Sequence, residues 1–198
     1  MPKGEQFGLA WEVATLEAMR AVVARAVDLR GKLGTEAERD SCLDAADVAA
    51  AYIQCPWPDW LPRHFLRLSP DIIAALPDHL KPPPGMRNPL WPVQKCLYGH
   101  PLSGHLWIKL FKRFLIDHGW EELSESLFSR DGCLLCVYVD DILMAGVAEE
   151  RAAAWREIQA EFDVGSVGPA EDFLGTHIAW TFEEGTWVCS LSMSEYCD

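Results

Sequence analysis

Two adjacent carboxylates interrupt the most apolar stretch of this chain. The run 133–146 reads as an apolar strand, then Asp140 and Asp141, then a second apolar strand. Carboxylates in apolar surroundings are costly unless they are paired, so the pattern predicts a tight hairpin with a divalent cation as partner of the acids. The simpler alternative is an exposed turn, where Asp is common. Hairpin turns favour Asn-Gly or Asp-Gly, however, whereas here Ile142 follows at once.

Composition indicates an ordinary globular protein. The 198 residues are 49% hydrophobic and 24% charged, which fits about one domain. No apolar run approaches the ~18 residues that span a membrane, and the N-terminus has no long apolar signal segment. We therefore expect an intracellular protein that is not secreted. The seven cysteines lack a disulfide framework and are expected to be reduced thiols.

The chain is acidic, with a net charge of −13 and a pI near 4.8. This balance argues against a protein that grips nucleic acid mainly through its own basic residues. It does not argue against a metal site, which concentrates carboxylates.

Periodicity predicts both helices and strands. Three helices are expected, over residues 11–33, 103–118 and 149–162. The first would be capped by Thr15 and ended by Gly31 and Gly34, and the second would have Ser103 as its N-cap and Gly119 after its end. The expected strands are 64–68, the pair within 133–146, 172–181 and 186–191. Together they predict an α+β fold, an antiparallel sheet with helices packed on one face.

A second strand should supply another acid, because two-metal nucleotidyl transfer uses carboxylates from more than one strand. Asp44 and Asp47 are the candidates. Asp47 is followed five residues later by Tyr52, an aromatic ring that would lie under an incoming sugar and exclude a 2′-hydroxyl. Asp44 has Ala49 at that spacing, so we favour Asp47 and expect Asp44 to be an ordinary polar residue.

Other chemical signals favour structural explanations. Cys133 and Cys136 have a Cys-x-x-Cys spacing, but residues three apart on a strand point to opposite faces, so both are expected in the core. His100 and His105 are expected to be surface or turn histidines. Trp57 and Trp60 have the rings to stack on bases, although packing is the favoured interpretation.

An ordered set of motifs resembles the copia-type reverse transcriptases of long-terminal-repeat retrotransposons. Asp47-Val-x-x-Ala-Tyr52 is similar to the family's first catalytic motif, and Tyr138-Val-Asp-Asp to its third. The intervening and following matches are 95–99 (Lys-Cys-Leu-Tyr-Gly), Trp107, 118–120 (His-Gly-Trp), 173–178 (Phe-Leu-Gly-Thr-His-Ile) and 191–196 (Leu-Ser-Met-Ser-Glu-Tyr).

The resemblance implies an RNA-directed DNA polymerase with a polymerase palm-like antiparallel sheet, located in the cytoplasm or in virus-like particles. Two Mg²⁺ ions, with Mn²⁺ as an alternative, would be held by Asp47, Asp140 and Asp141. The implied substrate-binding residues are Val48, Tyr52, Lys95 and Gly99, and the implied primer grip is Phe173, Leu174 and Gly175. The implied partners are an RNA or DNA template-primer, deoxynucleoside triphosphates and the integrase and RNase H of a polyprotein, with no membrane.

The chain also departs from the family pattern. After Gly99 it has His-Pro-Leu-Ser-Gly-His where the family has Leu-Lys-Gln-Ala/Ser-Pro-Arg, so basic and amide contacts are lost. We expect residues 1–198 to be an incomplete palm with the start of the fingers, without thumb or RNase H. The alternatives are a catalytically inactive, retrotransposon-derived remnant that retains the palm fold, or another metal-dependent phosphotransferase or nuclease. Tyr52 argues for a polymerase over a nuclease.

Overall fold

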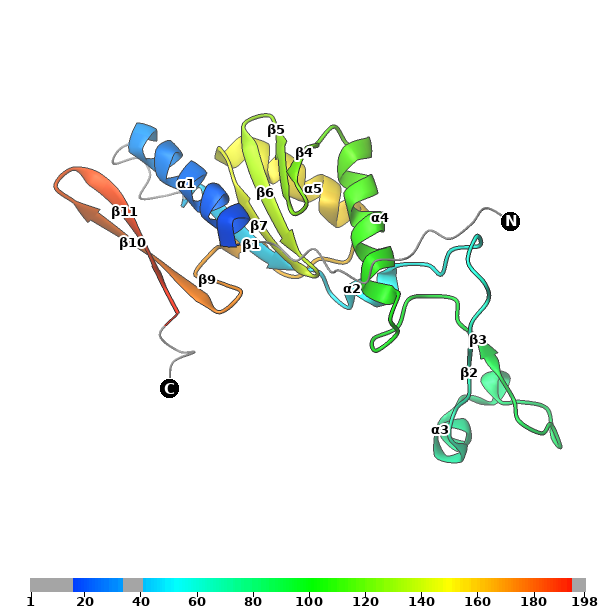
Figure 1. Ribbon diagram of the computed structural model, residues 1–198. Coiled ribbons are helices and arrows are strands. Elements are labelled where there is room, and N and C mark those ends of the chain that lie inside the picture. The colour runs from blue at the N-terminus through cyan, green and yellow to red at the C-terminus, as the bar shows by residue number, and fades with distance from the viewer. Residues whose placement is uncertain (1–15, 34–40, 194–198) are drawn as a thin grey trace.

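The computed structural model describes residues 16–33 and 41–193, which form an α+β fold built on antiparallel sheets (Figure 1). The central sheet has six strands in the order β4-β5-β6-β7-β1-β8, and every neighbouring pair is antiparallel. These strands are β1 (Leu43–Asp47), β4 (Glu121–Ser124), β5 (Leu127–Arg130), β6 (Cys133–Tyr138), β7 (Asp141–Ala145) and β8 (Gly168–Pro169). The predicted α+β class with an antiparallel sheet is confirmed.

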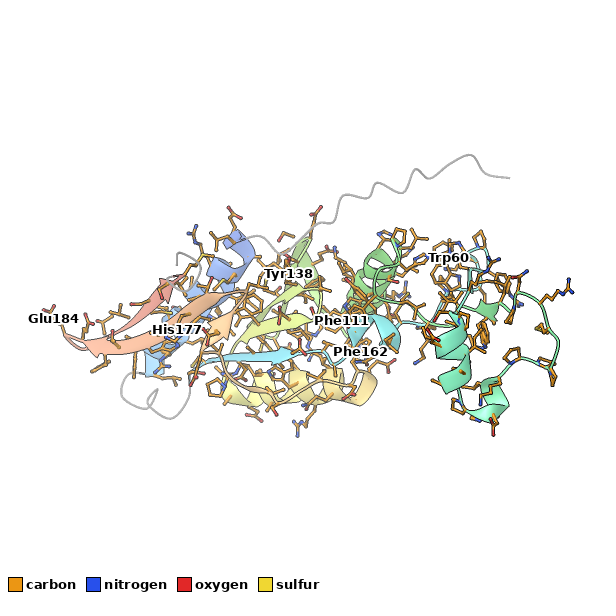
Figure 2. All side chains as sticks on the ribbon, turned by 90° about the horizontal axis from the view of Figure 1, so that it is seen from below. Trp60, Phe111, Tyr138, Phe162, His177 and Glu184 are labelled. Carbon is orange, nitrogen blue, oxygen red and sulfur yellow. The ribbon has the colours of Figure 1, made fainter. Side chains whose placement is uncertain are left out.

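Helices lie on both faces of the central sheet. The predicted one-sided arrangement holds for α4 (Ser103–Asp117) and α5 (Ala148–Glu161), whereas α1 (Leu16–Leu33) covers the opposite face. The rings of Phe111 and Phe162, seen together in Figure 2, lie 5.2 Å apart between α4 and the end of α5. The sheet is therefore buried from both sides at its centre.

Strand alternation divides the buried side chains between these two faces. Ile142 and Met144 of β7 face α4 and α5, while Leu143 and Ala145 face α1. A strand that is covered on both faces needs apolar residues at every position, which explains the continuous apolar run around the acids. In β6, Cys133 and Cys136 belong to opposite faces and are buried, as predicted.

A second sheet follows α5, with the order β11-β10-β9. Its strands are β9 (Asp172–Phe173), β10 (Thr176–Glu183) and β11 (Thr186–Ser192). The predicted single strand 172–181 is thus divided, because Leu174 and Gly175 form a turn with φ values of 50° and 72°. The β10–β11 hairpin extends away from the central sheet, with Glu184 at its tip (Figure 2).

The chain between α2 (Ala51–Gln54) and α4 forms a small lobe, which projects at the lower right of Figure 1. It contains β2 (Phe65–Leu66) paired with β3 (Trp91–Pro92), α3 (Pro70–Ala75) and the 3₁₀ helix η2 (Asp78–Leu80). The predicted strand 64–68 is therefore shorter than expected. Trp57 is buried here, as the packing interpretation predicts, whereas Trp60 is 60% exposed and that interpretation is wrong for it.

The ends of the helices confirm one of the predicted capping residues and contradict others. Gly119 follows α4 with φ 82°, as predicted for a glycine at that position. Gly31 lies inside α1 rather than at its end, and Thr15 and Gly34 fall outside the described residues. Ser103 is the first residue of α4 and not its N-cap, which is Leu102; the Ser103 hydroxyl accepts the Leu97 N–H at 2.9 Å.

The described cysteines are all free thiols. Burial raises the pKa of Cys55 and of Cys136 to about 12, so both stay protonated and unreactive near neutral pH. None of the helices among residues 16–33 and 41–193 has the length and apolar character needed to cross a membrane.

Candidate active site

The acidic pair lies at the β6–β7 hairpin. Tyr138 of β6 pairs with Asp141 of β7, so Val139 and Asp140 form a two-residue turn between them. Val139 has φ 54°, whereas Asp140 does not have a positive φ. A β-branched residue is strained in this region, and the strain lies immediately beside the two carboxylates.

Strand β1 ends beside this turn and brings a third carboxylate. Asp47 is the cross-strand partner of Asp141 in the β1–β7 register. Directly opposed residues on neighbouring strands have side chains on the same face, with Cβ atoms about 4.5–5.5 Å apart. Tyr138, the partner of Asp141 on the other side, lies in the same row. Asp47 and Asp141 therefore point the same way at one end of the sheet.

Backbone hydrogen bonds hold the turn and the end of β1 together. The Val48 N–H donates to the Asp140 carbonyl at 2.8 Å, and the Gly165 N–H donates to the Asp47 carbonyl at 2.8 Å. The Ala49 N–H donates to the Asp163 carbonyl at 2.9 Å. The N–H groups of Val48 and Ala49 are thus engaged within the protein, and the predicted role of Val48 in substrate binding stays a prediction.

Electrostatics disfavour full ionisation of these acids. Burial, and then the charge of Asp140, raise the pKa of Asp47, while burial, Asp140 and Asp47 raise the pKa of Asp141. No residue of the described chain forms an ion pair with Asp47, Asp140 or Asp141. The local negative charge is therefore not neutralised by any described side chain.

This donor set fits a hard divalent cation. Mg²⁺ is commonly held by one or two carboxylates together with substrate phosphates and water, and Asp47 and Asp141 provide such a pair. Among the described residues, however, no group of three His, Cys, Asp or Glu side chains converges to hold an ion. The protein thus presents a partial coordination shell, which a phosphate-bearing substrate would have to complete.

Asp44 has a different role from Asp47. Three residues apart on β1, the two point to opposite faces. Asp44 accepts a hydrogen bond from Arg151 Nε at 2.7 Å, and the two side chains are 15% and 6% exposed. Arg151 also donates to the Gly146 carbonyl at 2.5 Å. Asp44 therefore fastens α5 to the sheet, on the face away from Asp47.

Tyr52 lies near the acids at the start of α2. Its ring centroid is 4.8 Å from that of Tyr98. Burial, then the nearby charge of Asp140, raise the pKa of Tyr52, so its hydroxyl stays protonated. The short helix that carries it is held by Gln54, whose amide donates to the Ala49 and Asp163 carbonyls and accepts the Asp163 N–H. This amide clamp was not predicted from the sequence.

The loop before α4 reaches Tyr52 through Tyr98. Gly99 follows with φ 82°, and a Cβ placed there would meet no atom within 4 Å, so its backbone faces open space. Lys95 is exposed, and its strand-like bridge to Pro56 ties the loop to the segment after α2. The structure therefore brings the loop of Lys95 and Gly99 beside the ring that adjoins the acids.

His100, which follows Gly99, belongs to a small cluster of rings with His64 and Trp57. The Leu102 N–H donates to His100 Nδ1 at 3.2 Å, so His100 Nε2 carries the hydrogen and donates to His64 Nδ1 at 2.9 Å. The ring centroid of Trp57 is 4.9 Å from that of His100. Burial and the neighbouring His64 lower the pKa of His100, which keeps this contact neutral.

The predicted primer-grip residues form the β9–β10 turn. Phe173 is buried in the core beneath α1, and Leu174 and Gly175 make the turn itself. Leu174 packs against the same cluster of buried residues as Tyr138. This turn and the acidic hairpin therefore rest on one shared core.

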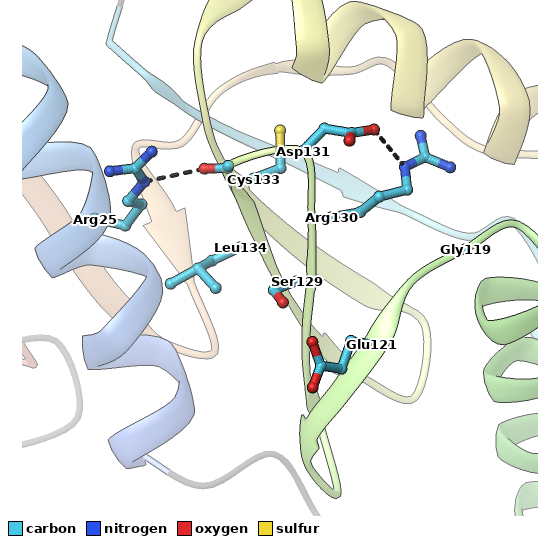
Figure 3. A pocket seen from close by; sticks show the side chains of 9 residues that line it. Arg25, Gly119, Glu121, Ser129, Arg130, Asp131, Cys133 and Leu134 are labelled. Atoms are coloured by element: carbon cyan, nitrogen blue, oxygen red, sulfur yellow. Dashed lines mark hydrogen bonds and ion pairs between the residues drawn. The ribbon is translucent and has the colours of Figure 1, made fainter.

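A cavity of about 480 Å³ lies elsewhere, at the β5–β6 turn (Figure 3). Arg25 donates to the Gly132 carbonyl at its edge, and Arg130 faces Asp131. Because β6 runs from this turn to Tyr138, the cavity lies at the opposite end of the strand from Asp140 and Asp141. It takes no part in the candidate site.

A comparison with known families identifies the family of this chain. The profile of the family described as reverse transcriptase (RNA-dependent DNA polymerase) matches residues 67–196, which include the acidic hairpin, the loop of Gly99 and the β9–β10 turn. Asp47 and Tyr52 precede the matched span. None of the curated proteins compared with the chain matches it. Since the match covers well over half of the 198 residues, the chain belongs to the reverse transcriptase family.

Proposed function

We propose that this chain is the palm of a copia-type reverse transcriptase, which extends a primer 3′-hydroxyl with deoxynucleoside triphosphates on an RNA template. Residues 1–198 would form the palm with the start of the fingers, within a retrotransposon polyprotein. The observation that carries the proposal is the register of β1 and β7, which puts Asp47 opposite Asp141 beside the Asp140 turn. An exposed turn without function would not need a third carboxylate in that place.

Asp47, Asp140 and Asp141 would hold two Mg²⁺ ions, or Mn²⁺ as an alternative. Bound there, such ions lower the pKa of the attacking 3′-hydroxyl and neutralise the leaving pyrophosphate. The carboxylates themselves bind and orient. Burial and the neighbouring carboxylates raise the pKa values of Asp47 and Asp141, and a bound cation would relieve this repulsion.

The incoming nucleotide would lie between the acids and the loop before α4. Tyr52, supported by the Tyr98 ring, would exclude a ribose 2′-hydroxyl. The open backbone at Gly99 would allow a base or sugar to approach, and exposed Lys95 would meet phosphate charge. Val48 would also contribute to substrate binding, while its N–H holds the Asp140 carbonyl at 2.8 Å.

The β9–β10 turn, with Phe173, Leu174 and Gly175, would help to position the primer. Leu174 and Tyr138 pack against the same cluster of buried residues, which supports this role because a shift of the β9–β10 turn would displace the packing beneath the β6–β7 turn. The remaining partners would be the integrase and RNase H of the same polyprotein, in an intracellular setting such as the cytoplasm or a virus-like particle.

Primer extension on an RNA template tests the proposal. The chain and a longer version carrying the upstream fingers are each assayed with Mg²⁺ and with a chelator. We expect chelator-sensitive extension, stronger in the longer version because the acidic chain has few basic residues for the template. No extension by either version would favour an inactive remnant of the palm.

A further inference from the structure

Trp107 makes a contact that packing alone does not require. Its side chain is fully buried on α4, and its ring lies 5.6 Å from Phe111 and 5.3 Å from Phe162 between centroids. Its indole Nε1–H donates to the Val139 carbonyl at 2.6 Å. The bond links α4 to the first residue of the acidic turn, 32 positions further along the chain.

A second buried tryptophan shows that such a bond is not obligatory in this core. Trp155 on α5 is also buried and belongs to the same cluster of buried residues. Its indole Nε1 has no hydrogen-bond partner among the described residues. The two tryptophans therefore offer a comparison between an indole that only packs and one that both packs and donates.

The turn that Trp107 contacts needs an external restraint. Val139 has φ 54°, a region that is energetically unfavourable for a β-branched residue. Both carbonyls of the turn are restrained from outside the hairpin, that of Val139 by Trp107 and that of Asp140 by the Val48 N–H. Without the indole bond, Val139 would gain by relaxing toward negative φ, and the adjoining carboxylates would move with it.

We propose that the Trp107 indole N–H is a positioning group, which holds the strained Val139 turn so that Asp140 and Asp141 stay aligned with Asp47. This role rests on the proposed function for its consequence in catalysis, but the restraint on the turn exists whether or not the chain polymerises. Trp107 itself contacts neither substrate nor metal in this account.

Three variants separate positioning from packing. Trp107→Phe keeps a six-membered aromatic ring in the core and removes only the pyrrole part of the indole, with its N–H donor. Trp155→Phe makes the same change where no hydrogen bond is lost. Val139→Gly removes the strain, because glycine adopts positive φ as readily as negative φ; combined with Trp107→Phe, it should make the indole bond dispensable.

Amide hydrogen exchange of the full chain provides a readout that does not depend on activity. In Trp107→Phe, we expect the Val48 N–H, which is bonded to the turn, to exchange about five- to tenfold faster, as for the loss of one hydrogen bond. The Gly146 N–H, bonded to Cys42 at the other end of β7, should be unchanged. Trp155→Phe should leave both rates unchanged, and Val139→Gly should reduce the effect of Trp107→Phe on Val48 to less than twofold.

Single-nucleotide incorporation by the same variants gives the catalytic consequence. Trp107→Phe should lower the maximal rate about tenfold with little change in the nucleotide concentration for half-maximal rate, since alignment rather than binding is impaired. Equal acceleration of Val48 and Gly146, or the same behaviour in Trp155→Phe, would show that Trp107 only packs and would overturn the proposal. Absence of incorporation by the unmodified chain with its fingers would count against the proposed function alone, and the exchange rates would still decide the role of Trp107.

Discussion

Asp47 and Asp141 are direct cross-strand partners at the ends of β1 and β7. Like charges in this position destabilise a sheet, and no described cation offsets them. The free energy of folding therefore carries a local cost at one end of the central sheet. Such a cost is expected where carboxylates serve to bind a ligand rather than to hold the fold.

Removing one of these charges should stabilise the chain in the absence of metal. For Asp141→Asn, we expect the free energy of unfolding to rise by about 0.5 kcal/mol, because a like-charge contact and a desolvated charge are both removed. Added Mg²⁺ should then stabilise the variant less than the unmodified chain. Denaturant titration with and without Mg²⁺ measures both effects, and destabilisation by Asp141→Asn would show that the carboxylate has a structural partner.

The raised pKa values of Asp47 and Asp141 predict a specific pH dependence. A carboxyl whose pKa is higher in the folded state binds its proton more tightly there than in the unfolded chain. Its contribution to stability is complete below the unfolded pKa of about 3.9 and is lost as the pH rises through the folded value. In the metal-free protein, these two groups should thus favour unfolding as the pH rises through this range.

Comparison with Asp47→Asn/Asp141→Asn isolates this contribution. The difference in melting temperature between the double variant and the unmodified chain should widen from pH 4 to pH 7 without metal. This difference in melting temperature should narrow with Mg²⁺, because the ion binds the deprotonated carboxylates of the unmodified chain. A difference that is independent of pH would contradict the electrostatic account of the pair.

The ion pair between Asp44 and Arg151 should matter for stability and not for metal binding. Arg151→Met leaves the Asp44 carboxylate buried without its charged partner, which should cost about 3 kcal/mol. Asp44→Asn/Arg151→Met removes both charges and should recover part of that loss. Denaturant unfolding measures both values, and a change in the Mg²⁺ dependence of the double variant would mean that the two acids of β1 are not separate in function.

Tyr52 should control the choice of sugar. Replacing it in Tyr52→Val removes the ring that stacks on Tyr98 and opens space beside Asp140. We expect the preference for deoxynucleotides over ribonucleotides to fall at least about tenfold. The preference is measured as the ratio of incorporation efficiencies for a deoxynucleotide and the matching ribonucleotide. Tyr98→Phe keeps the stacked ring and is the control; an equal fall in that variant would attribute sugar selection to the loop before α4 rather than to Tyr52.

Much of this site follows from local sequence patterns. The β6–β7 hairpin was predictable because two apolar segments flank the acids. Asp47, favoured for its spacing to Tyr52, lies opposite Asp141, while its role as a metal ligand stays a prediction. Gly119 was predictable because a glycine with positive φ commonly follows a helix. These signals lie within a few residues of the features that they determine.

The features that were missed depend on distant contacts. Strands β4 and β5 were not predicted; every residue of β4 is exposed, so it has no apolar alternation to reveal it. Gln54 bonds to Asp163, and Trp107 to Val139, across separations that no periodicity encodes. Ser103 was misassigned because a serine before an apolar run resembles an N-cap, while its hydroxyl in fact accepts the Leu97 N–H.

Mg²⁺-dependent nucleotide incorporation by carboxylate variants tests the central claim most directly. The chain with its fingers is compared with Asp47→Asn, Asp141→Asn and, as a matched control, Asp131→Asn, an acid in the β5–β6 turn at the far end of β6. The account predicts chelator-sensitive incorporation that falls at least about 100-fold in Asp47→Asn and Asp141→Asn and is unchanged in Asp131→Asn. Incorporation that survives in Asp47→Asn or Asp141→Asn would contradict it.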